Sequence, residues 1–326
     1  MNESQLEILS EIVRAVKAGR RFLVVTHVRP DGDAVGSVLA LTFMLRKLGR
    51  EADAFCADPL PIGYDFLAGA EDIRHDVPDP SSYDVAITVD CGDFQRVGDE
   101  FAEAIARIPL LVNIDHHVGK SVFGHINWVQ TSASSTCEML YRLSSMLEVP
   151  LDADISSQLY TGILTDTGSF RFSNTNRDVL EIASRLVASG AQPSLIAQYV
   201  YDSGQPQRLR LLAKVLASVT FHADDRLAAA ELSQRMLAET GTSHLDSEGF
   251  INELRSVRPV RLAMLFREGR NGMVHVSLRS KGDVDVAGFA HKYGGGGHRQ
   301  AAAFRVAGNL EEVRSAFTTE ALSYIA

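Results

Sequence analysis

Cysteine is scarce in this sequence, and long apolar segments are missing. The three cysteines among its 326 residues, Cys56, Cys91 and Cys137, lie far apart and form no CxxC pair. This pattern predicts buried free thiols in a protein of a reducing compartment. No apolar run approaches the roughly 18 residues of a membrane span, and the N-terminal segment lacks the basic-then-apolar layout of a signal peptide. We therefore predict a cytoplasmic protein without a membrane segment.

Positive charge is also in short supply. Lysine and arginine number 32 against 41 acidic residues, which gives a net charge of -9. A protein that coats long nucleic acid neutralises many phosphates with basic side chains, so the charge argues against that class. A short phosphorylated ligand remains compatible, because one pocket can be positive while the whole chain is negative.

The first half of the chain alternates short apolar runs with helical patterns. Strands are expected over residues 22–26, 51–56, 84–89 and 110–114, and helices over 5–18, 34–49 and 98–107. This alternation is typical of an α/β fold, here a doubly wound and mainly parallel sheet.

The second half changes from helical to β-rich character. Helical patterns dominate from 134 to 216, followed by β-rich segments over 215–232, 261–280 and 301–308 and helices near 246–255 and 310–323. A chain of 326 residues exceeds the usual size of a single core. We therefore predict a metal-binding catalytic domain over 1–202, a linker region over 203–216 and a smaller α/β substrate-binding domain over 217–326.

Three of the predicted strands end in side chains that commonly bind metals. His27 follows the first strand, Asp90 the third, and Asp115, His116 and His117 the fourth. Ligands of open α/β sheets bind beyond the carboxyl ends of the strands, so these groups should converge. A single histidine or aspartate at such a position is more often structural, whereas the convergence of several favours a metal site.

Further carboxylates extend this set. Asp31 and Asp33 belong to a PDGD loop before a helix, and Asp166 ends a later helix. Four carboxylates in one site would raise one another's pKa values unless cations balanced them, and two divalent ions supply the matching charge. The predicted metal ligands are His27, Asp31, Asp33, Asp90, His116 and Asp166. Oxygen and nitrogen ligands without thiolate suit Mn²⁺, with Mg²⁺, Fe²⁺, Co²⁺ or Zn²⁺ as alternatives, and a metal pair suits phosphoester hydrolysis.

Five motifs resemble those of a known family. HVRPDGDAVGS, VDCGD, DHH and TDTGSFRFSNT look like the four motifs of the DHH phosphoesterase superfamily, and GGGGHRQAAAF looks like the signature of its DHH-associated C-terminal domain. The layout is most similar to the NrnA-type branch of nano-RNases and 3′-phosphoadenosine-5′-phosphate (pAp) phosphatases. The resemblance implies Mn²⁺-dependent hydrolysis of RNA oligomers a few nucleotides long, of linear dinucleotides such as pApA, and of pAp to AMP.

The resemblance also implies a role for each motif residue. One metal would be held by His27, Asp31 and Asp90, and the other by Asp33, Asp90, His116 and Asp166. Asp90 would thus bridge the pair. His117 would contact the scissile phosphate and could act as general acid, while Asp115 would orient the histidines.

The glycine run at 294–297 is the most unusual C-terminal feature. Four glycines are not expected in an ordinary strand or helix, but their amides can form an anion site, although a flexible turn is an equal alternative. By the resemblance, Arg279 at the end of the 261–280 segment would also bind the nucleotide. Tyr293, His291 or Phe304 could stack a base. The predicted substrate-binding residues are Arg96, Arg279, Gly295, Gly296, Gly297, His298 and Arg299. For Arg96, which belongs to the first domain, a surface role is an equal alternative.

Three other functions stay open at this stage: a RecJ-like single-strand exonuclease, a pyrophosphatase or polyphosphatase, and a non-catalytic nucleotide-sensing protein. The predicted partners are short RNA oligonucleotides or small nucleotides, and apolar faces of the first domain could support a homodimer.

Overall fold

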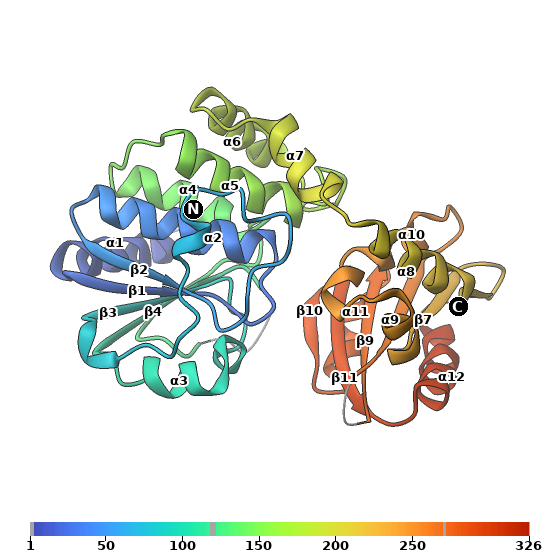
Figure 1. The fold of residues 1–326 in the computed structure, drawn as a ribbon. Helices are drawn as coiled ribbons and strands as arrows, with labels where there is room; N and C mark the ends of the chain where they lie inside the picture. The colour runs from blue at the N-terminus through green and yellow to red at the C-terminus, as the bar shows by residue number, and fades with distance from the viewer. Residues whose placement is uncertain (1–2, 118–121, 270–271, 326) are drawn as a thin grey trace. The chain divides into compact units, whose positions relative to one another are not determined.

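The computed structural model describes residues 3–117, 122–269 and 272–325. The chain divides into two compact units, Met1–Ser203 and Gly204–Ala326 (Figure 1). None of the helices in the described ranges is long and apolar enough to cross a membrane.

Within those ranges, the first unit is built on a five-stranded parallel sheet in the order β2-β1-β3-β4-β5. Its strands are β1 Arg21–Val25, β2 Glu51–Phe55, β3 Val85–Val89, β4 Leu110–Asp115 and β5 Ile126–Val129. Every residue of β3 is buried, because helices cover both faces of a parallel sheet. The doubly wound α/β prediction is confirmed, whereas β5 was not anticipated.

Two layers of helices enclose this sheet (Figure 1). The helices are α1 Glu3–Ala18, α2 Gly32–Lys47, α3 Asp99–Ile105, α4 Thr136–Met146, α5 Ala153–Asp166, α6 Arg177–Ala188 and α7 Pro193–Asp202, with 3-10 turns at Ala70–Asp72, Pro80–Ser82 and Phe94–Val97. One core cluster joins the sheet to α1, α2, α4 and α5, and a second joins its other face to α3. Glycines let α2 approach α5 closely, since a Cβ on Gly36 would lie 2.4 Å from the carbonyl oxygen of Gln158.

The second unit contains a six-stranded mixed sheet in the order β10-β11-β9-β8-β7-β6. Its strands are β6 Thr220–His222, β7 Leu227–Leu232, β8 Leu262–Glu268, β9 Met273–Ser280, β10 Gly296–His298 and β11 Ala301–Ala307. Its helices are α8 Pro206–Ala217, α9 Gln234–Thr240, α10 Phe250–Ser256, α11 Val286–His291 and α12 Leu310–Ala321, with 3-10 turns at His244–Ser247 and Leu322–Tyr324. Only the β7 and β8 pair is parallel among its described strands. Residues 270–271 of the expected β segment lie outside the described residues.

Most of the predicted linker is helical. Helix α8 covers Pro206–Ala217, and its Leu211 and Val215 are buried in a core cluster with β7 and α10. The helix also includes residues 215–217, which were expected to be β-rich. The functional division into a catalytic domain over 1–202 and a substrate domain over 217–326 stays a prediction.

Candidate metal centre

The centre lies where β1, β3 and β4 end. His27 follows β1, Asp90 follows β3, and His116 follows Asp115, the last residue of β4. The Nε2 atoms of His27 and His116 each lie 3.4 Å from a carboxylate oxygen of Asp90. All three side chains are almost fully buried. The parallel register therefore brings the strand-end groups together, as the sequence pattern predicted.

Two further carboxylates come from the start of α2. Asp31 is the N-cap, and its Oδ1 accepts hydrogen bonds from the amides of Asp33 and Ala34, both at 3.1 Å. Asp31 is exposed, whereas Asp33 is fully buried. Helix capping explains why an aspartate stands at this position. The two capping bonds use only Oδ1 of Asp31.

The sixth predicted ligand enters from α5. Asp166 is the last residue of this helix, and its Oδ2 lies 3.0 Å from Nε2 of His116. The same nitrogen lies 3.7 Å from Oδ2 of Asp33. Helix α5 thus adds a carboxylate to the groups that the strand ends and α2 provide.

Among the six predicted ligands, two groups of donor atoms have the size of a cation site. Ligand atoms of His27, Asp31 and Asp90 lie within 4.8 Å of one another, and so do those of Asp33, Asp90 and His116. Asp90 belongs to both groups. Mixed carboxylate and imidazole donors, all of them buried except Asp31, fit divalent cations of the Mn²⁺ type.

Three acid groups of this cluster, Asp33, Asp90 and Asp166, carry perturbed pKa values. Burial raises the pKa of Asp33 well above its usual range, and the neighbouring Asp90 and Asp166 raise it further. Burial also raises the pKa of Asp166. Asp90 differs: burial acts to raise its pKa, but hydrogen bonds with His116 and His27 hold it well below the usual range. A divalent cation would relieve the repulsion that perturbs Asp33 and Asp166.

The backbone at Asp90 is strained. Its φ is +58°, in the left-handed region that residues other than glycine seldom adopt. Such a conformation costs of the order of 1–3 kcal/mol and persists only where the surroundings enforce it. Here the Asp90 amide donates to the carbonyl oxygen of Ile114 at 3.0 Å, which ties the strained residue to β4.

Asp115 and His117 form a pair beside these groups. Nδ1 of His117 lies 2.8 Å from Oδ1 of Asp115 and 3.5 Å from Oδ1 of Asp90. Asp115 is fully buried, while the His117 side chain is 19% exposed. This placement suits the predicted roles, with Asp115 as the orienting group and His117 facing substrate.

Sequence reasoning missed the groups that contact the candidate ligands from behind. The amides of Thr136 and Cys137 donate to Asp33, and the Asn174 side chain contacts the backbone of Asp166. A Ser-Ser-Thr-Cys-Glu run at 134–138 carries a helix-start signature, with Ser135 as N-cap and Glu138 three residues on. That signature could have predicted the start of α4, but not that its amides contact Asp33.

In the second unit the glycine run corrects one expectation, because Gly296–His298 forms β10 and pairs antiparallel with β11. The glycines are needed for close approach: a Cβ on Gly295 would lie 2.2 Å from the carbonyl oxygen of Ala303, and one on Gly297 would lie 2.4 Å from that of Ala301. Part of the run therefore forms a strand, contrary to the expectation from its composition. Anion binding by its amides stays a prediction.

The other predicted substrate residues have defined surroundings. Arg299 donates to the carbonyl oxygen of Asp283 at 3.1 Å, and Arg279 to that of Leu278 at 3.0 Å. His298 ends β10 and is half-buried. In the first unit, the backbone carbonyl of the half-buried Arg96 accepts from the Val28 amide at 2.7 Å, so this residue supports the loop after β1.

The three aromatic candidates for base stacking do not share one environment. Phe304 is 3% exposed and packs among Phe289 and Phe317, which rules out stacking on a ligand. Tyr293 is half-buried, and its hydroxyl donates to Glu320. His291 is exposed.

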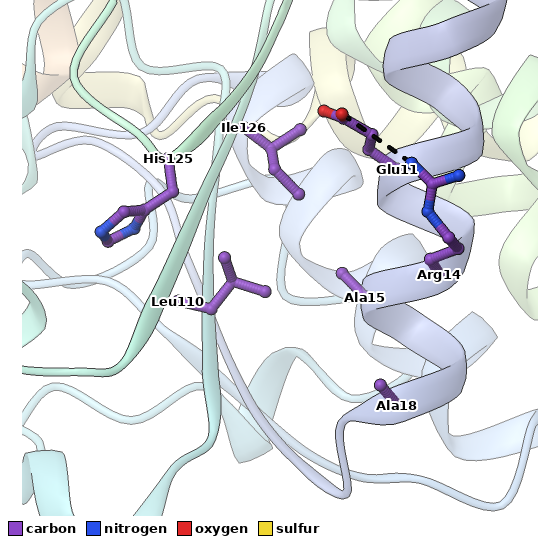
Figure 2. A pocket seen from close by; sticks show the side chains of 7 residues that line it. All are labelled: Glu11, Arg14, Ala15, Ala18, Leu110, His125 and Ile126. Atoms are coloured by element: carbon purple, nitrogen blue, oxygen red, sulfur yellow. Dashed lines mark ion pairs between the residues drawn. The ribbon is translucent and has the colours of Figure 1, made fainter.

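A separate pocket of about 460 Å³ lies between α1 and the sheet (Figure 2). Its lining residues are Glu11, Arg14, Ala15, Ala18, Leu110, His125 and Ile126. Leu110 begins β4, whereas the metal-type side chains lie beyond the end of that strand. The pocket is therefore distinct from the candidate metal centre.

The parallel sheet carries, at the ends of its strands, a largely buried cluster of carboxylates and imidazoles that could hold metal ions. Residues 21–163 match the DHH family N-terminal domain, and residues 224–325 match the DHHA1 domain. The chain belongs to the DHH family, whose members are metal-dependent phosphoesterases.

Individual relatives agree with this assignment. The chain is 35% identical to the bifunctional oligoribonuclease and PAP phosphatase NrnA of Thermus thermophilus, over 91% of this chain and 87% of that protein. It is 29% identical to the protein of the same name from Bacillus subtilis, over 89% and 90%. The crystal structure of an exopolyphosphatase-related protein from Bacteroides fragilis matches with a TM-score of 0.88 and 27% identity, over 98% of this chain and 96% of that one.

Proposed function

We propose that the protein hydrolyses short RNA oligonucleotides, including dinucleotides such as pApA, to mononucleotides and converts pAp to AMP. The observation that carries this proposal is the position of Asp90, which belongs to both cation-sized donor groups formed by the predicted ligands. A centre of this kind suits phosphoester hydrolysis. The names of the Thermus and Bacillus relatives favour short RNA and pAp as substrates.

The proposed cofactor is a pair of divalent cations, Mn²⁺ in the first place, with Mg²⁺ or Co²⁺ as alternatives. His27, Asp31 and Asp90 would hold one, and Asp33, Asp90, His116 and Asp166 the other. Two such cations would supply an activated water and would stabilise charge on the attacking and leaving oxygens.

His117 is the proposed general acid. Because Asp115 is the acceptor for Nδ1 of His117, Nε2 is the nitrogen from which a proton can reach the leaving oxygen. Asp115 fixes the orientation of the imidazole throughout. His117 would also contact the scissile phosphate.

The second unit is proposed to bind the nucleotide portion of the substrate. Arg279, His298, Arg299 and the amides of Gly295, Gly296 and Gly297 would serve as phosphate donors, with Arg96 in the first unit. The net charge of -9 favours short ligands over long strands. A cytoplasmic location and a homodimer are further parts of the proposal, and light scattering tests the dimer.

A substrate panel with Mn²⁺ tests the function. Release of mononucleotides is measured from pApA and RNAs of increasing length, and of phosphate from pAp, with the Asp90→Ala variant and EDTA as controls. We expect fast cleavage of dimers and trimers and phosphate release from pAp. Faster degradation of long single strands would favour an exonuclease, and pyrophosphate hydrolysis would favour a pyrophosphatase. No hydrolysis with Mn²⁺, Co²⁺ or Mg²⁺ would leave a nucleotide-sensing role.

A further inference from the structure

The first turn of α4 lies directly behind the candidate ligands. The Thr136 amide donates to Oδ2 of Asp33 at 2.6 Å, and the Cys137 amide donates to Oδ1 of Asp33 at 2.9 Å. Each oxygen of this buried carboxylate thus has its own donor. Amides at a helix N-terminus are unsatisfied within the helix and carry partial positive charge, so they suit a carboxylate. The two bonds fix the plane of the Asp33 carboxylate.

The same turn also reaches Asp90. The Thr136 hydroxyl donates to Oδ1 of Asp90 at 3.2 Å, and all three groups are buried. Thr136 therefore contacts Asp33 through its backbone and Asp90 through its side chain. Its position couples two carboxylates that come from different elements.

Other side chains hold this turn in place. The Ser135 hydroxyl accepts from the Glu138 amide at 3.1 Å, and the buried Glu138 carboxylate accepts from the Ser134 amide at 2.7 Å. Arg142 pairs with the other oxygen of Glu138, also at 2.7 Å. The turn is thus fixed from within α4.

Asn174 links the turn to the backbone of Asp166, the residue that carries a third carboxylate. Its Nδ2 donates to the backbone carbonyls of Ser134 and Asp166, both at 3.1 Å. Two carbonyl partners define the orientation of the amide, since only the NH₂ group can donate to both. Asp166 is the residue of α5 that contacts His116. A single side chain therefore spans the α4 turn and the end of α5.

We propose that Thr136 and Asn174 are positioning residues that set the spacing of Asp33, Asp90 and Asp166 for metal binding. The inference rests on the proposed function only in that these carboxylates are ligands. Neighbouring carboxylates repel one another. The fixed donors to the Asp33 and Asp90 carboxylates, together with the Asn174 contact to the Asp166 backbone, hold the three groups at the spacing that a cation requires. Groups of this kind around a metal site typically contribute 10- to 100-fold to its affinity.

Calorimetric titration of the metal-free protein with Mn²⁺ tests the proposal. We expect Asn174→Ala to weaken Mn²⁺ binding by about 10-fold or more. Asn176→Ala is the matched control, because Asn176 stands two residues away and only caps α6 by accepting from the Val179 amide at 3.0 Å. It should lower the melting temperature and leave the Mn²⁺ dissociation constant unchanged. Equal weakening in both variants would mean that general stability of this segment is responsible, and would overturn the proposal.

A second pair keeps the test independent of folding defects. Thr136→Val keeps the shape but lacks the hydroxyl and should weaken Mn²⁺ binding, whereas Thr136→Ser keeps the hydroxyl and should restore it. Wild-type affinity in both Thr136→Val and Asn174→Ala would refute the proposal, as would a wild-type protein that binds none of Mn²⁺, Mg²⁺ and Co²⁺. A wild type that binds Mn²⁺ but cleaves no substrate would contradict the proposed function alone, because this titration requires no turnover.

Discussion

Asp115 and His117 are joined by a 2.8 Å contact between Oδ1 and Nδ1 at the end of β4. Asp115 is fully buried, so its carboxylate has a fixed direction. An amide at this position could also donate and would favour the wrong imidazole tautomer. We therefore expect Asp115→Asn to lower kcat by about 10²- to 10⁴-fold, the range of general acid–base catalysis, with Mn²⁺ affinity unchanged.

The control for this variant is Asp154→Asn, which neutralises an exposed carboxylate in the first turn of α5. It should leave kcat unchanged. If Asp115→Asn weakened Mn²⁺ binding as strongly as it lowered kcat, Asp115 would be a metal ligand, which the 4.8 Å group of Asp90, Asp115 and His117 would permit.

Gly162 in α5 occupies a position where no side chain fits. A Cβ there would lie 2.6 Å from Oδ1 of Asp33 and 2.3 Å from Sγ of Cys137. Gly→Ala in a helix interior otherwise stabilises by roughly 0.5–1 kcal/mol, but overpacking costs about 1–3 kcal/mol. We expect Gly162→Ala to lower both the melting temperature and the Mn²⁺ affinity. Gly288→Ala in α11, where the nearest atom is 3.8 Å away, is the matched control and should be neutral or stabilising. An unchanged Mn²⁺ affinity in Gly162→Ala would argue against tight packing behind Asp33.

Strand positions and the convergence of the candidate ligands could be predicted because both follow local rules. A strand buried on both faces is a continuous apolar run, as in β3, and parallel strands end at the same edge. Strand β5 was missed because only Trp128 of its four residues is buried, which leaves no such run. Helix α11 was also missed. It is six residues long and includes Gly288, so it is too short to show a helical period in the sequence.

The groups behind the ligands could not be predicted, because they depend on contacts between distant segments. Thr136 follows Asp33 by 103 residues, and nothing in the sequence near either residue marks the pair. The glycine run illustrates the same limit. The composition of the run shows that it lacks side chains. The reason is visible only in the structure, where the backbone of the neighbouring strand β11 lies too close to leave room for a Cβ.

The pKa shifts predict how pH affects the metal-free protein. The pKa values of Asp33, Asp166 and His116 are all raised in the folded state, the last because hydrogen bonds with Asp166 and Asp90 outweigh the lowering by burial. A group whose pKa is raised by folding contributes its full stability below its unfolded-state pKa. This contribution is lost as the pH rises through the folded-state pKa. The pKa of Asp90 is lowered, so this group changes stability with pH in the opposite direction. Its effect is confined to pH values below 3.8, the ordinary pKa of an aspartate.

The free energy of unfolding in EDTA should therefore decrease from about pH 5 to pH 8, by up to about 1.4 kcal/mol per pH unit for each responsible group. Urea unfolding measures this. Mn²⁺ should reverse the trend, since its ligands bind in the deprotonated form. Asp33→Asn should flatten the pH dependence without metal, and an unchanged slope in this variant would contradict the assignment to the cluster.

The glycine run allows a test that separates sheet packing from phosphate binding. At Gly295 a Cβ would lie 2.2 Å from the Ala303 carbonyl oxygen, so Gly295→Ala should destabilise the second unit by about 1–3 kcal/mol. At Gly296 the nearest atom is His291 Cε1 at 3.7 Å, and Gly296→Ala should change stability by less than about 0.5 kcal/mol. If the amides of the run bind phosphate, the added methyl group of Gly296→Ala hinders approach and raises KM for a dinucleotide at an unchanged melting temperature. An unchanged KM would mean that the glycines serve the sheet alone, because the same variant leaves the fold intact and alters only the surface that a phosphate would contact.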